Sequence, residues 1–292
     1  MRTAPHGSST ARPAVEPRHI GGRDLTSWTT PLGRSVARAG HRLAAWVGPH
    51  LMLLITLAVG AVVASALTGV AAEVYESVVQ ADGVAALDHP VLDAAVSARS
   101  ATLNAAVTAY TTIGGPVGMP ILATVVTLLL ARARRSWTPV VLMLAACGGS
   151  LAMTIAGKVL IGRTRPPLAE AVPPYESSAS FPSGHSLNAV VVAGVVAYLL
   201  VQRQERTSTR AWTVVAALLF ATTMGLTRVF LGHHWLTDVL AAWALGLAWL
   251  ALVITAHRLF LTVWHRPGQD PSHDVGPDPQ RQPGTADVRP RR

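Results

Sequence analysis

The fold is limited most strongly by a series of long stretches that contain no charged side chain. None of Asp, Glu, Lys or Arg occurs between Arg42 and Glu73, and the same holds for 136–157, 186–202, 211–227 and 239–257. Each stretch is near the roughly 17 to 25 residues with which an α-helix crosses a bilayer. The composition agrees, since only 13% of the residues are charged, against about 25% in a soluble domain. The chain is therefore predicted to be an integral membrane protein.

A sixth uncharged stretch lies between Arg99 and Arg132. The sequence Gly-Gly-Pro at 114–116 divides it, so only 116–131 is expected to cross the membrane. The preceding segment, 73–115, has apolar residues at helical spacing, which predicts amphipathic helices at the outer membrane surface. The predicted fold is all-α: a six-transmembrane-helix bundle with this outer amphipathic segment between its first and second helices.

The sequence predicts one membrane domain and two polar tails. Residues 1–42 and 267–292 are rich in Pro, Gly and polar residues without an apolar period, which predicts disordered cytoplasmic tails. The membrane domain is expected over 43–266. Its third span contains Cys147, the only cysteine of the chain. A disulfide framework and a cysteine-based metal site are therefore excluded.

The arginines set the expected orientation. Basic residues precede the first span and recur in alternate connections: Arg2, Arg12, Arg18, Arg23, Arg34, Arg38 and Arg42, then Arg132, Arg134 and Arg135, then Arg203, Arg206 and Arg210, and Arg258 onward. The positive-inside rule places these connections and both termini in the cytoplasm. The first outer segment agrees, because it is mainly acidic: Glu73, Glu76, Asp82, Asp88 and Asp93 against Arg99. A multi-pass protein of the cell membrane is expected.

The net charge of +9 comes mostly from the cytoplasmic arginines. We interpret them as topology signals that also attract anionic lipid headgroups. Binding to nucleic acid is the alternative interpretation. No interleaved aromatic residues or nucleic-acid motif accompany these arginines, so membrane lipids are the expected partners and nucleic acid is not.

Several cations occur on the predicted outer side, where the topology rule disfavours them. Lys158, the only lysine, ends the third span, and Arg163 and Arg165 follow it. Lys158 and Arg165 are seven residues apart and would share a face if the helix continued. Snorkelling is the ordinary explanation for a single lysine at the end of a span. A group of cations at this place instead suggests an anion-binding site.

The sequence F-P-S-G-H-S at 181–186 stands immediately before the fourth span. A helix that begins here would present backbone N–H groups and its positive dipole end to an anion. Ser183 could cap the helix or donate its hydroxyl, Gly184 would let a ligand approach the backbone, and His185 would lie beside it. By itself, however, this sequence is also a common turn.

A third polar stretch, T-R-V-F-L-G-H-H-W-L-T-D at 227–238, joins the last two spans. If the residues from His234 onward are helical, Asp238 lies four residues later on the same face and can hold the imidazole. An imidazole held in this way, with its other nitrogen free, is a nucleophile or a general base. A bend at Gly232 could bring Arg228 over the same spot, which makes an anion the expected ligand.

The sequences K-V-L-I-G-R-T-R-P at 158–166, P-S-G-H at 182–185 and the stretch 227–238 resemble the three signature motifs of the type 2 phosphatidic acid phosphatase superfamily of lipid phosphatases. The matching residues are Lys158, Arg165, Pro166, Pro182, Ser183, Gly184, His185, Arg228, His234 and Asp238. Thr227 stands where the family has serine, so the hydroxyl is kept. The resemblance extends over roughly 116–258.

The resemblance implies a role for each of these side chains. His234 would attack phosphorus and carry the phosphoryl group, while Asp238 holds its far nitrogen. His185 would protonate the leaving oxygen and later activate water. The phosphate would be bound by Lys158, Arg165, Arg228, the Ser183 hydroxyl and the Gly184 N–H. No metal or other cofactor is implied.

The implied substrate is a lipid phosphate or an isoprenoid diphosphate on the outer face of the membrane. Phosphatidate, phosphatidylglycerol phosphate and undecaprenyl diphosphate are all compatible with the motifs, which bind the phosphate and not the lipid tail. Two other functions are considered. A non-catalytic six-span protein that binds or transports an anion would not need the full set of nucleophile, carboxylate and acid. Vanadate-dependent haloperoxidase chemistry fits poorly with a site at the membrane.

Two further residues of the motifs have an ordinary interpretation. His233 is the alternative nucleophile, but it is five residues from Asp238. About 140° of helix rotation therefore separates it from the line that His234 makes with that carboxylate. We prefer His234 and expect His233 to pack or to line the site. Arg163 could add to the phosphate site, but a solvated loop cation is the preferred interpretation.

Overall fold

The structure, a computed structural model, describes residues 19–20, 23–24 and 49–264. The predicted tails therefore lie outside the described residues, except that β1 (His19–Ile20) pairs antiparallel with β2 (Arg23–Asp24). Every other described element is a helix. The prediction of a helical membrane fold is confirmed, with this pair of short strands as the one exception in the described part of the chain.

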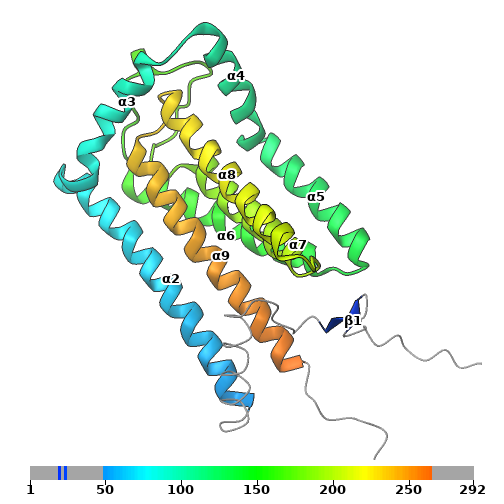
Figure 1. Ribbon diagram of the computed structural model, residues 1–292. Helices are drawn as coiled ribbons and strands as arrows, with labels where there is room; N and C mark the ends of the chain where they lie inside the picture. Colours follow the sequence, from blue (N-terminus) through cyan, green and yellow to red (C-terminus); the bar gives the residue numbers. More distant parts are fainter. Residues whose placement is uncertain (1–18, 21–22, 25–48, 265–292) are drawn as a thin grey trace, which may run out of the picture.

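Long helices form the body of the molecule (Figure 1). They are α2 (Pro49–Gln80), α5 (Gly118–Arg134), α6 (Thr138–Ile161), α7 (Gly184–Val201), α8 (Thr207–Phe230) and α9 (Leu236–Trp264). Shorter helices lie between them: η1 (Gly83–Leu87), α3 (Asp88–Ser97), α4 (Ala101–Thr111), η2 (Thr112–Gly114) and η3 (Leu168–Glu170). Most of the short helices lie at one end of the body, where they connect α2 to α5.

Five described helices are long and apolar enough to cross a membrane: α2, α6, α7, α8 and α9. The segments 101–114 and 118–134 make a sixth candidate only when they are taken together, and they are bent by 53° at the break between them. The break predicted at Gly-Gly-Pro is present. However, α4, which we assigned to the outer segment, forms the first half of this bent pair.

Local sequence explains where several helices begin and end. α6 begins at Thr138 as predicted, with Pro139 in its first turn, where a proline has no N–H to leave unpaired. It ends at Ile161 because Gly162 adopts the left-handed conformation, with φ of 60°. Lys158 and Arg165 are not on one continuous helix, because α6 ends between them. α2 continues to Gln80, beyond the expected end of the first span at Ala72.

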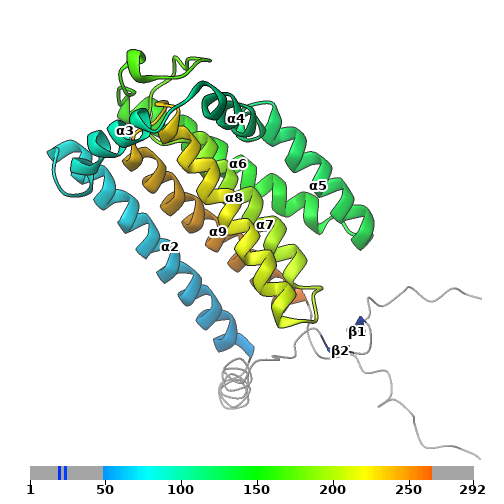
Figure 2. The ribbon, with the colours of Figure 1, turned by 45° about the horizontal axis from the view of Figure 1, so that its top comes forward.

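The core of the bundle lies around α7, which packs against α6, α8 and α9 (Figure 2). Its side chains at 187, 191, 195 and 199 are completely or almost completely buried. Gly194 allows a close approach to α9, since a Cβ atom there would lie 2.2 Å from a methyl carbon of Leu250. Small residues at such contacts are typical of membrane helices. α2 packs mainly along α9.

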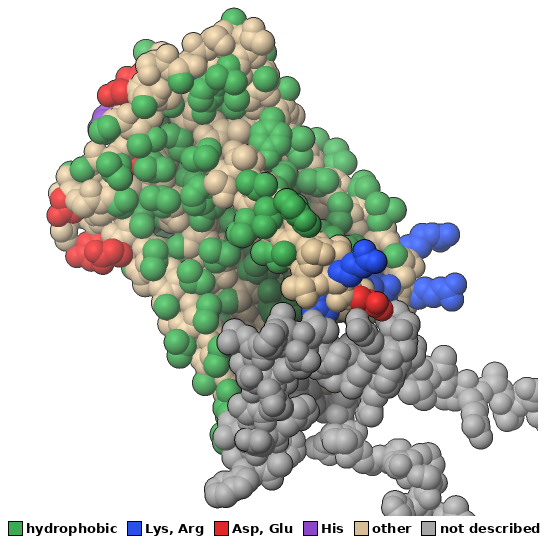
Figure 3. Space-filling view, viewed as in Figure 1, with side chains coloured by type: hydrophobic (Ala, Val, Ile, Leu, Met, Phe, Trp, Pro, Cys, Tyr) green, Lys and Arg blue, Asp and Glu red, His purple; other side chains and the backbone are tan. Residues whose placement is uncertain are grey.

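The surface differs between the two ends of the bundle (Figure 3). Hydrophobic side chains cover most of the visible body, as expected for contact with lipid tails. Lys and Arg side chains gather at the end where α5 is joined to α6 and α7 to α8. Most of the visible Asp and Glu side chains lie toward the opposite end, beside α2 and α3. Several deeply buried polar side chains also belong to this opposite end.

Candidate active site

Three segments that are far apart in the sequence meet at the end of the bundle opposite the exposed arginines. They are the end of α6 with the loop 162–183, the beginning of α7, and the turn 231–235 between α8 and α9. The N–H of Ser183 donates to the carbonyl of Asp238 at 3.2 Å, which ties the beginning of α7 to α9. The segments that contain the three sequence motifs are therefore in contact.

The turn between α8 and α9 folds back on itself at Gly232. This glycine has φ of +70°, and a Cβ atom there would lie 2.4 Å from the carbonyl oxygen of Glu170, so a larger residue would not fit. The N–H groups of His233 and His234 both donate to the carbonyl of Arg228, at 2.9 and 3.2 Å. The predicted bend is present. α9 begins at Leu236, two residues after His234.

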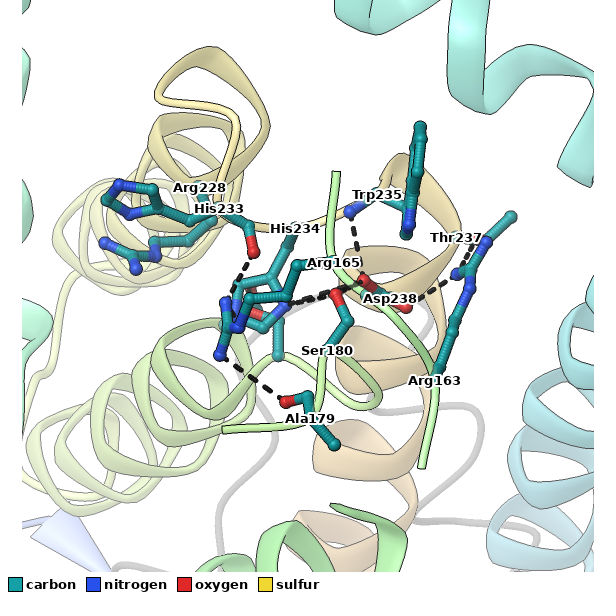
Figure 4. A network of polar contacts seen from close by, with 12 residues as sticks. Arg163, Arg165, Ala179, Ser180, Arg228, His233, His234, Trp235, Thr237 and Asp238 are labelled. Atoms are coloured by element: carbon teal, nitrogen blue, oxygen red, sulfur yellow. Dashed lines mark hydrogen bonds and ion pairs between the residues drawn. The ribbon is translucent and has the colours of Figure 1, made fainter. Parts of the chain in front are cut away.

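His234 lies at the centre of this end of the bundle and is only 1% exposed (Figure 4). Its Nδ1 atom is 3.5 Å from Oδ2 of Asp238 and 3.4 Å from Oγ of Ser180. Its Nε2 atom is 3.3 Å from a guanidinium nitrogen of Arg165. Burial lowers the pKa of His234 to about 4, although Asp238 acts to raise it. The imidazole is therefore neutral at pH 7, and neutral imidazole is the nucleophilic form.

The Asp238 carboxylate is completely buried and is held by several donors. Oδ2 accepts hydrogen bonds from the Ser180 hydroxyl at 2.5 Å and from the N–H of Trp235 at 3.0 Å. Oδ1 accepts from Arg163 at 2.6 Å. The bond to Trp235, the residue before α9, also satisfies a free N–H at the helix start. The carboxylate that faces His234 is thus fixed in position.

His233 faces away from this arrangement. Figure 4 places its ring on the other side of the turn from Asp238. Its Nε2 atom is 2.7 Å from the carbonyl oxygen of Val172, which holds the loop 162–183 against the turn. Burial removes the imidazole from water, and this is the main reason that its pKa is lowered. The side chain has an ordinary packing place, as expected, and it is not paired with Asp238. The helix rotation on which this expectation was based does not apply, because α9 begins only at Leu236.

Lys158 and Arg165 converge through the loop instead of along one helix. Lys158 donates to the Ser178 hydroxyl at 3.1 Å and also to the carbonyl of Ala179. Arg165 donates to the carbonyl and the hydroxyl of Ser178, at 2.7 and 3.1 Å. It also reaches the carbonyl of His233 at 2.5 Å. Arg165 is therefore held at the edge of the imidazole, and Lys158 is bound to the same loop residues, 178–179.

Arg228 is 2% exposed and shares an anionic partner with Arg165. Arg165 pairs with one carboxylate oxygen of Glu176 at 2.7 Å, and Arg228 pairs with the other. Arg228 also donates to the Thr111 hydroxyl at 3.2 Å, and its buried Nε has no hydrogen-bond partner in the part of the chain that the structure describes. Two guanidinium groups that bind one carboxylate are arranged to bind a phosphate in the same manner.

The P-S-G-H sequence forms the beginning of α7, as expected. Ser183 is completely buried and does not cap the helix through its side chain, contrary to one of its two predicted roles. Its hydroxyl accepts a hydrogen bond from Ser186 at 2.8 Å, so its own hydrogen remains free to donate. The N–H of Gly184 lies in the first turn of α7. His185 is the second residue of α7.

The bend between α4 and α5 closes the side of the site around His185. A Cβ atom at Gly114 would lie 3.1 Å from the His185 ring, and one at Gly115 would lie 3.6 Å from its Nε2. The Thr111 hydroxyl is 2.9 Å from that of Thr227. The bent pair therefore contributes to the site, which the sequence analysis did not anticipate.

One interpretation from the sequence is wrong. Arg163 is not a solvated loop cation, because its side chain is 15% exposed and pairs with both Asp88 and Asp238. Glu176, Ser180 and Asp88 were not recognised as parts of this region. Glu176 lies between the first and second motifs in the sequence, outside both. The other two gave no local signal, because their partners are far away in the chain.

Comparisons with known proteins agree with the motifs. The model of a family described as the PAP2 superfamily matches residues 136–260. Phosphatidylglycerophosphatase B of Bacillus subtilis is 34% identical over 181 residues, which cover 62% of this chain and 88% of that protein. An undecaprenyl-diphosphatase of Sulfolobus acidocaldarius is 32% identical over 80 residues, or 27% of this chain and 34% of that protein.

A solved structure is similar as well. It is the crystal structure of a transmembrane PAP2-type phosphatidylglycerolphosphate phosphatase from Bacillus subtilis, with a TM-score of 0.56 and 30% sequence identity. The similarity covers 73% of this chain and 95% of that one. It therefore extends well beyond the motif-bearing residues 158–238.

Proposed function

This chain belongs to the PAP2 superfamily and is a membrane lipid phosphatase, and we propose that it hydrolyses its substrate through a phosphohistidine on His234. The observation that carries the proposal is the position of this imidazole. Its Nδ1 atom faces the buried carboxylate of Asp238, and its Nε2 atom lies beside Arg165. A proton on Nδ1 leaves the lone pair on Nε2 free to attack phosphorus.

In the first proposed step, the bond from Nε2 to phosphorus forms and the bond from phosphorus to the leaving oxygen breaks. His185 gives its proton to that oxygen. In the second step, His185 takes a proton from water, whose oxygen attacks the phosphoryl group and releases inorganic phosphate and neutral His234. Asp238 stabilises the charge that develops on the imidazole in each step.

The cations of the site have the role of stabilising charge on the transferring phosphoryl group. Arg165 and Arg228 already bind the two oxygens of one carboxylate, so we assign them to two phosphate oxygens. Lys158, the Ser183 hydroxyl and the Gly184 N–H complete the proposed set. These groups supply the positive charge without a metal ion, so we expect the reaction to be independent of added metal.

The proposed topology is based on the difference between the two ends of the bundle. The exposed arginines between α5 and α6 and between α7 and α8 are assigned to the cytoplasm, and α4 with α5 is counted as the sixth span. Both termini are then cytoplasmic, and His234 lies near the outer surface of the cell membrane. A lipid phosphate in the outer leaflet would present its headgroup at this depth.

The names of the relatives suggest which lipid substrates to test first. The Bacillus relative, whose name specifies phosphatidylglycerophosphate, is matched over 88% of its length. The Sulfolobus relative, named for undecaprenyl diphosphate, is matched over 34%. We therefore place phosphatidylglycerol phosphate first, followed by undecaprenyl diphosphate and phosphatidate.

The test is phosphate release by the full chain purified in detergent, with a metal chelator present. We expect the wild type to hydrolyse at least one of these three lipids, His234→Ala to be inactive, and the matched variant His233→Ala to keep most of its activity. Activity that is retained in His234→Ala but lost in His233→Ala would refute the assignment of the nucleophile. A strict requirement for added metal would refute the metal-free reaction.

A further inference from the structure

A buried charge bridge connects the first outer segment to the back of the proposed active site. Asp88, the first residue of α3, is 3% exposed. One nitrogen of Arg163 pairs with Asp88 at 2.7 Å, and another pairs with Asp238 at 2.6 Å. We refer to these three side chains as the Asp88–Arg163–Asp238 bridge. Its members come from α3, from the loop after α6 and from α9.

The bridge occupies Oδ1 of Asp238, while Oδ2 accepts from the Ser180 hydroxyl and the Trp235 N–H. Arg163 binds Oδ1, whereas Oδ2 is the oxygen that faces Nδ1 of His234. A carboxylate that is held at one oxygen cannot rotate freely, so the other oxygen keeps its direction. Figure 4 shows Arg163 on the side of Asp238 away from His234. Arg163 therefore acts on the imidazole only through Asp238.

Asp88 fixes both Arg163 and the helix that carries Asp238. Its Oδ1 accepts a hydrogen bond from the N–H of Thr237 at 2.9 Å, and its Oδ2 accepts from the Thr237 hydroxyl at 2.7 Å. The same hydroxyl accepts from Arg163 at 2.7 Å. Beside it, His89 contacts the ring of Trp235, with the two centroids 4.8 Å apart. The beginning of α3 is therefore built against the turn that carries the imidazole.

The charges of the bridge have a consequence for the reaction. Arg163 alone would neutralise Asp238, and a neutralised pair would give little support to a positively charged imidazole. Asp88 supplies the second negative charge, so that one net negative charge remains next to His234. Three charged groups buried together are unfavourable for folding unless all are paired, and each member of this bridge is paired.

We propose that Asp88 and Arg163 are positioning residues of the phosphatase: they hold the Asp238 carboxylate with one oxygen toward His234 and preserve its negative charge during phosphoryl transfer. This proposal rests on the role proposed above for His234. It assigns to the first outer segment a part in the reaction, although that segment contains none of the three motifs.

The test compares two variants of Asp88 and one control variant in kinetics and thermal unfolding. Asp88→Asn keeps the shape of the side chain and removes its charge, whereas Asp88→Glu keeps the charge and changes the length. Asp93→Asn changes an exposed carboxylate of the same helix and is the matched control. If charge is what matters, kcat of Asp88→Asn falls about ten- to a hundredfold, the size typical of partners that orient a reactive side chain.

In the same experiment we expect the KM of Asp88→Asn to stay within about twofold, because no phosphate-binding group is changed. Asp88→Glu should recover most of kcat, and Asp93→Asn should equal the wild type. The proposal is overturned if Asp88→Asn has the kcat of the wild type. It is also overturned if Asp88→Asn and Asp88→Glu lose activity only in proportion to a loss of folded protein.

A double-variant measurement tests whether Asp88 acts through Asp238. In the background of Asp238→Asn there is no charged carboxylate left to orient, so adding Asp88→Asn should lower the residual kcat by less than about twofold. A full additional loss would contradict the proposal. These outcomes are separate from failure of the proposed function, which would appear as a wild-type protein without phosphatase activity or as an active His234→Ala variant.

Discussion

The Nδ1 atom of His234 lies 3.5 Å from Oδ2 of Asp238, and both side chains are almost completely buried. A buried carboxylate in this position fixes the ring and the nitrogen that carries the proton. The same pairing leaves Nε2 toward Arg165. The reactivity of the imidazole should therefore depend on this pair and on the groups that surround it.

Replacement of Asp238 by Asn should leave substrate binding nearly unchanged and abolish most of the turnover. The amide keeps the size of the side chain, but it cannot stabilise a positively charged imidazole and favours the wrong tautomer. We expect kcat to fall about 10³- to 10⁴-fold, as in other histidine–carboxylate pairs. Steady-state kinetics with the preferred lipid measure this, and a variant with more than a tenth of the wild-type kcat would be inconsistent with the pairing.

Thr227 stands where the family pattern has serine, and its variants test whether the two residues are equivalent here. Its hydroxyl lies 2.9 Å from that of Thr111, which accepts from Arg228, and it donates to the carbonyl of Met224 at 2.6 Å. Thr227→Ser should therefore remain within about twofold of the wild type in kcat/KM. Thr227→Val removes one hydrogen-bond partner of the buried Thr111 hydroxyl, which binds Arg228, and should lose about tenfold. Equal activity of the two variants would contradict a role for the hydroxyl.

Glu176 should compete with phosphate, because its carboxylate pairs with both Arg165 and Arg228. Removing its charge in Glu176→Gln should strengthen inhibition by inorganic phosphate about tenfold, which corresponds to one charge-assisted hydrogen bond. Inhibition constants at pH 7 measure the effect. Glu170→Gln, in the same loop, is the control and should behave as the wild type. Weaker inhibition of Glu176→Gln would mean that the carboxylate does not occupy the position of the phosphate.

The stability of the fold should depend on the charge of Glu176. Burial acts to raise the pKa of this carboxyl, but the charges of Arg228 and Arg165 outweigh it and lower the pKa from 4.5 to about 2. A lowered pKa means that the stabilisation is fully present above about pH 4.5 and is lost as the pH falls toward 2. Thermal unfolding in detergent should show a difference between wild type and Glu176→Gln that shrinks over this range.

The control for the pH experiment is Glu73→Gln, which removes an exposed carboxylate of α2. Its melting temperature should follow that of the wild type at every pH. If the difference between wild type and Glu176→Gln is the same at pH 7 and at pH 3, the ion pairs of Glu176 do not contribute to stability in the way described.

The helices that carry the motifs could be predicted from the sequence because their signals are local. The stretch 138–157 lacks charge and begins next to a proline, and α6 begins at Thr138 as expected. Gly232 marked the turn that folds back over Arg228. Uncharged runs, prolines and glycines each act on a few neighbouring residues, so their effects appear in the order of the chain.

The contacts that hold the site residues in place could not be predicted from local signals. Asp88 pairs with Arg163, 75 residues later, and nothing near either residue indicates the other. The sequence neighbours of Arg163 form a polar loop, which favours the interpretation as a solvated cation. The bent pair that α4 forms with α5 was not expected for a related reason, since the break at Gly-Gly-Pro gives no local sign of how the two helices are placed. Such pairings depend on how whole helices pack.

The most direct test of the account is to trap the phosphoryl group on the chain. His185→Ala lacks the proposed activator of water, and p-nitrophenyl phosphate has a leaving group that needs no proton. This combination should give a burst of one p-nitrophenol per active site and accumulate the intermediate. After quenching at alkaline pH and digestion with trypsin, fragmentation of the peptide 229–258 distinguishes His233 from His234 by mass. The account predicts the phosphoryl group on His234, whereas a phosphoryl group on His233, or a burst without any phosphorylated histidine, would contradict it.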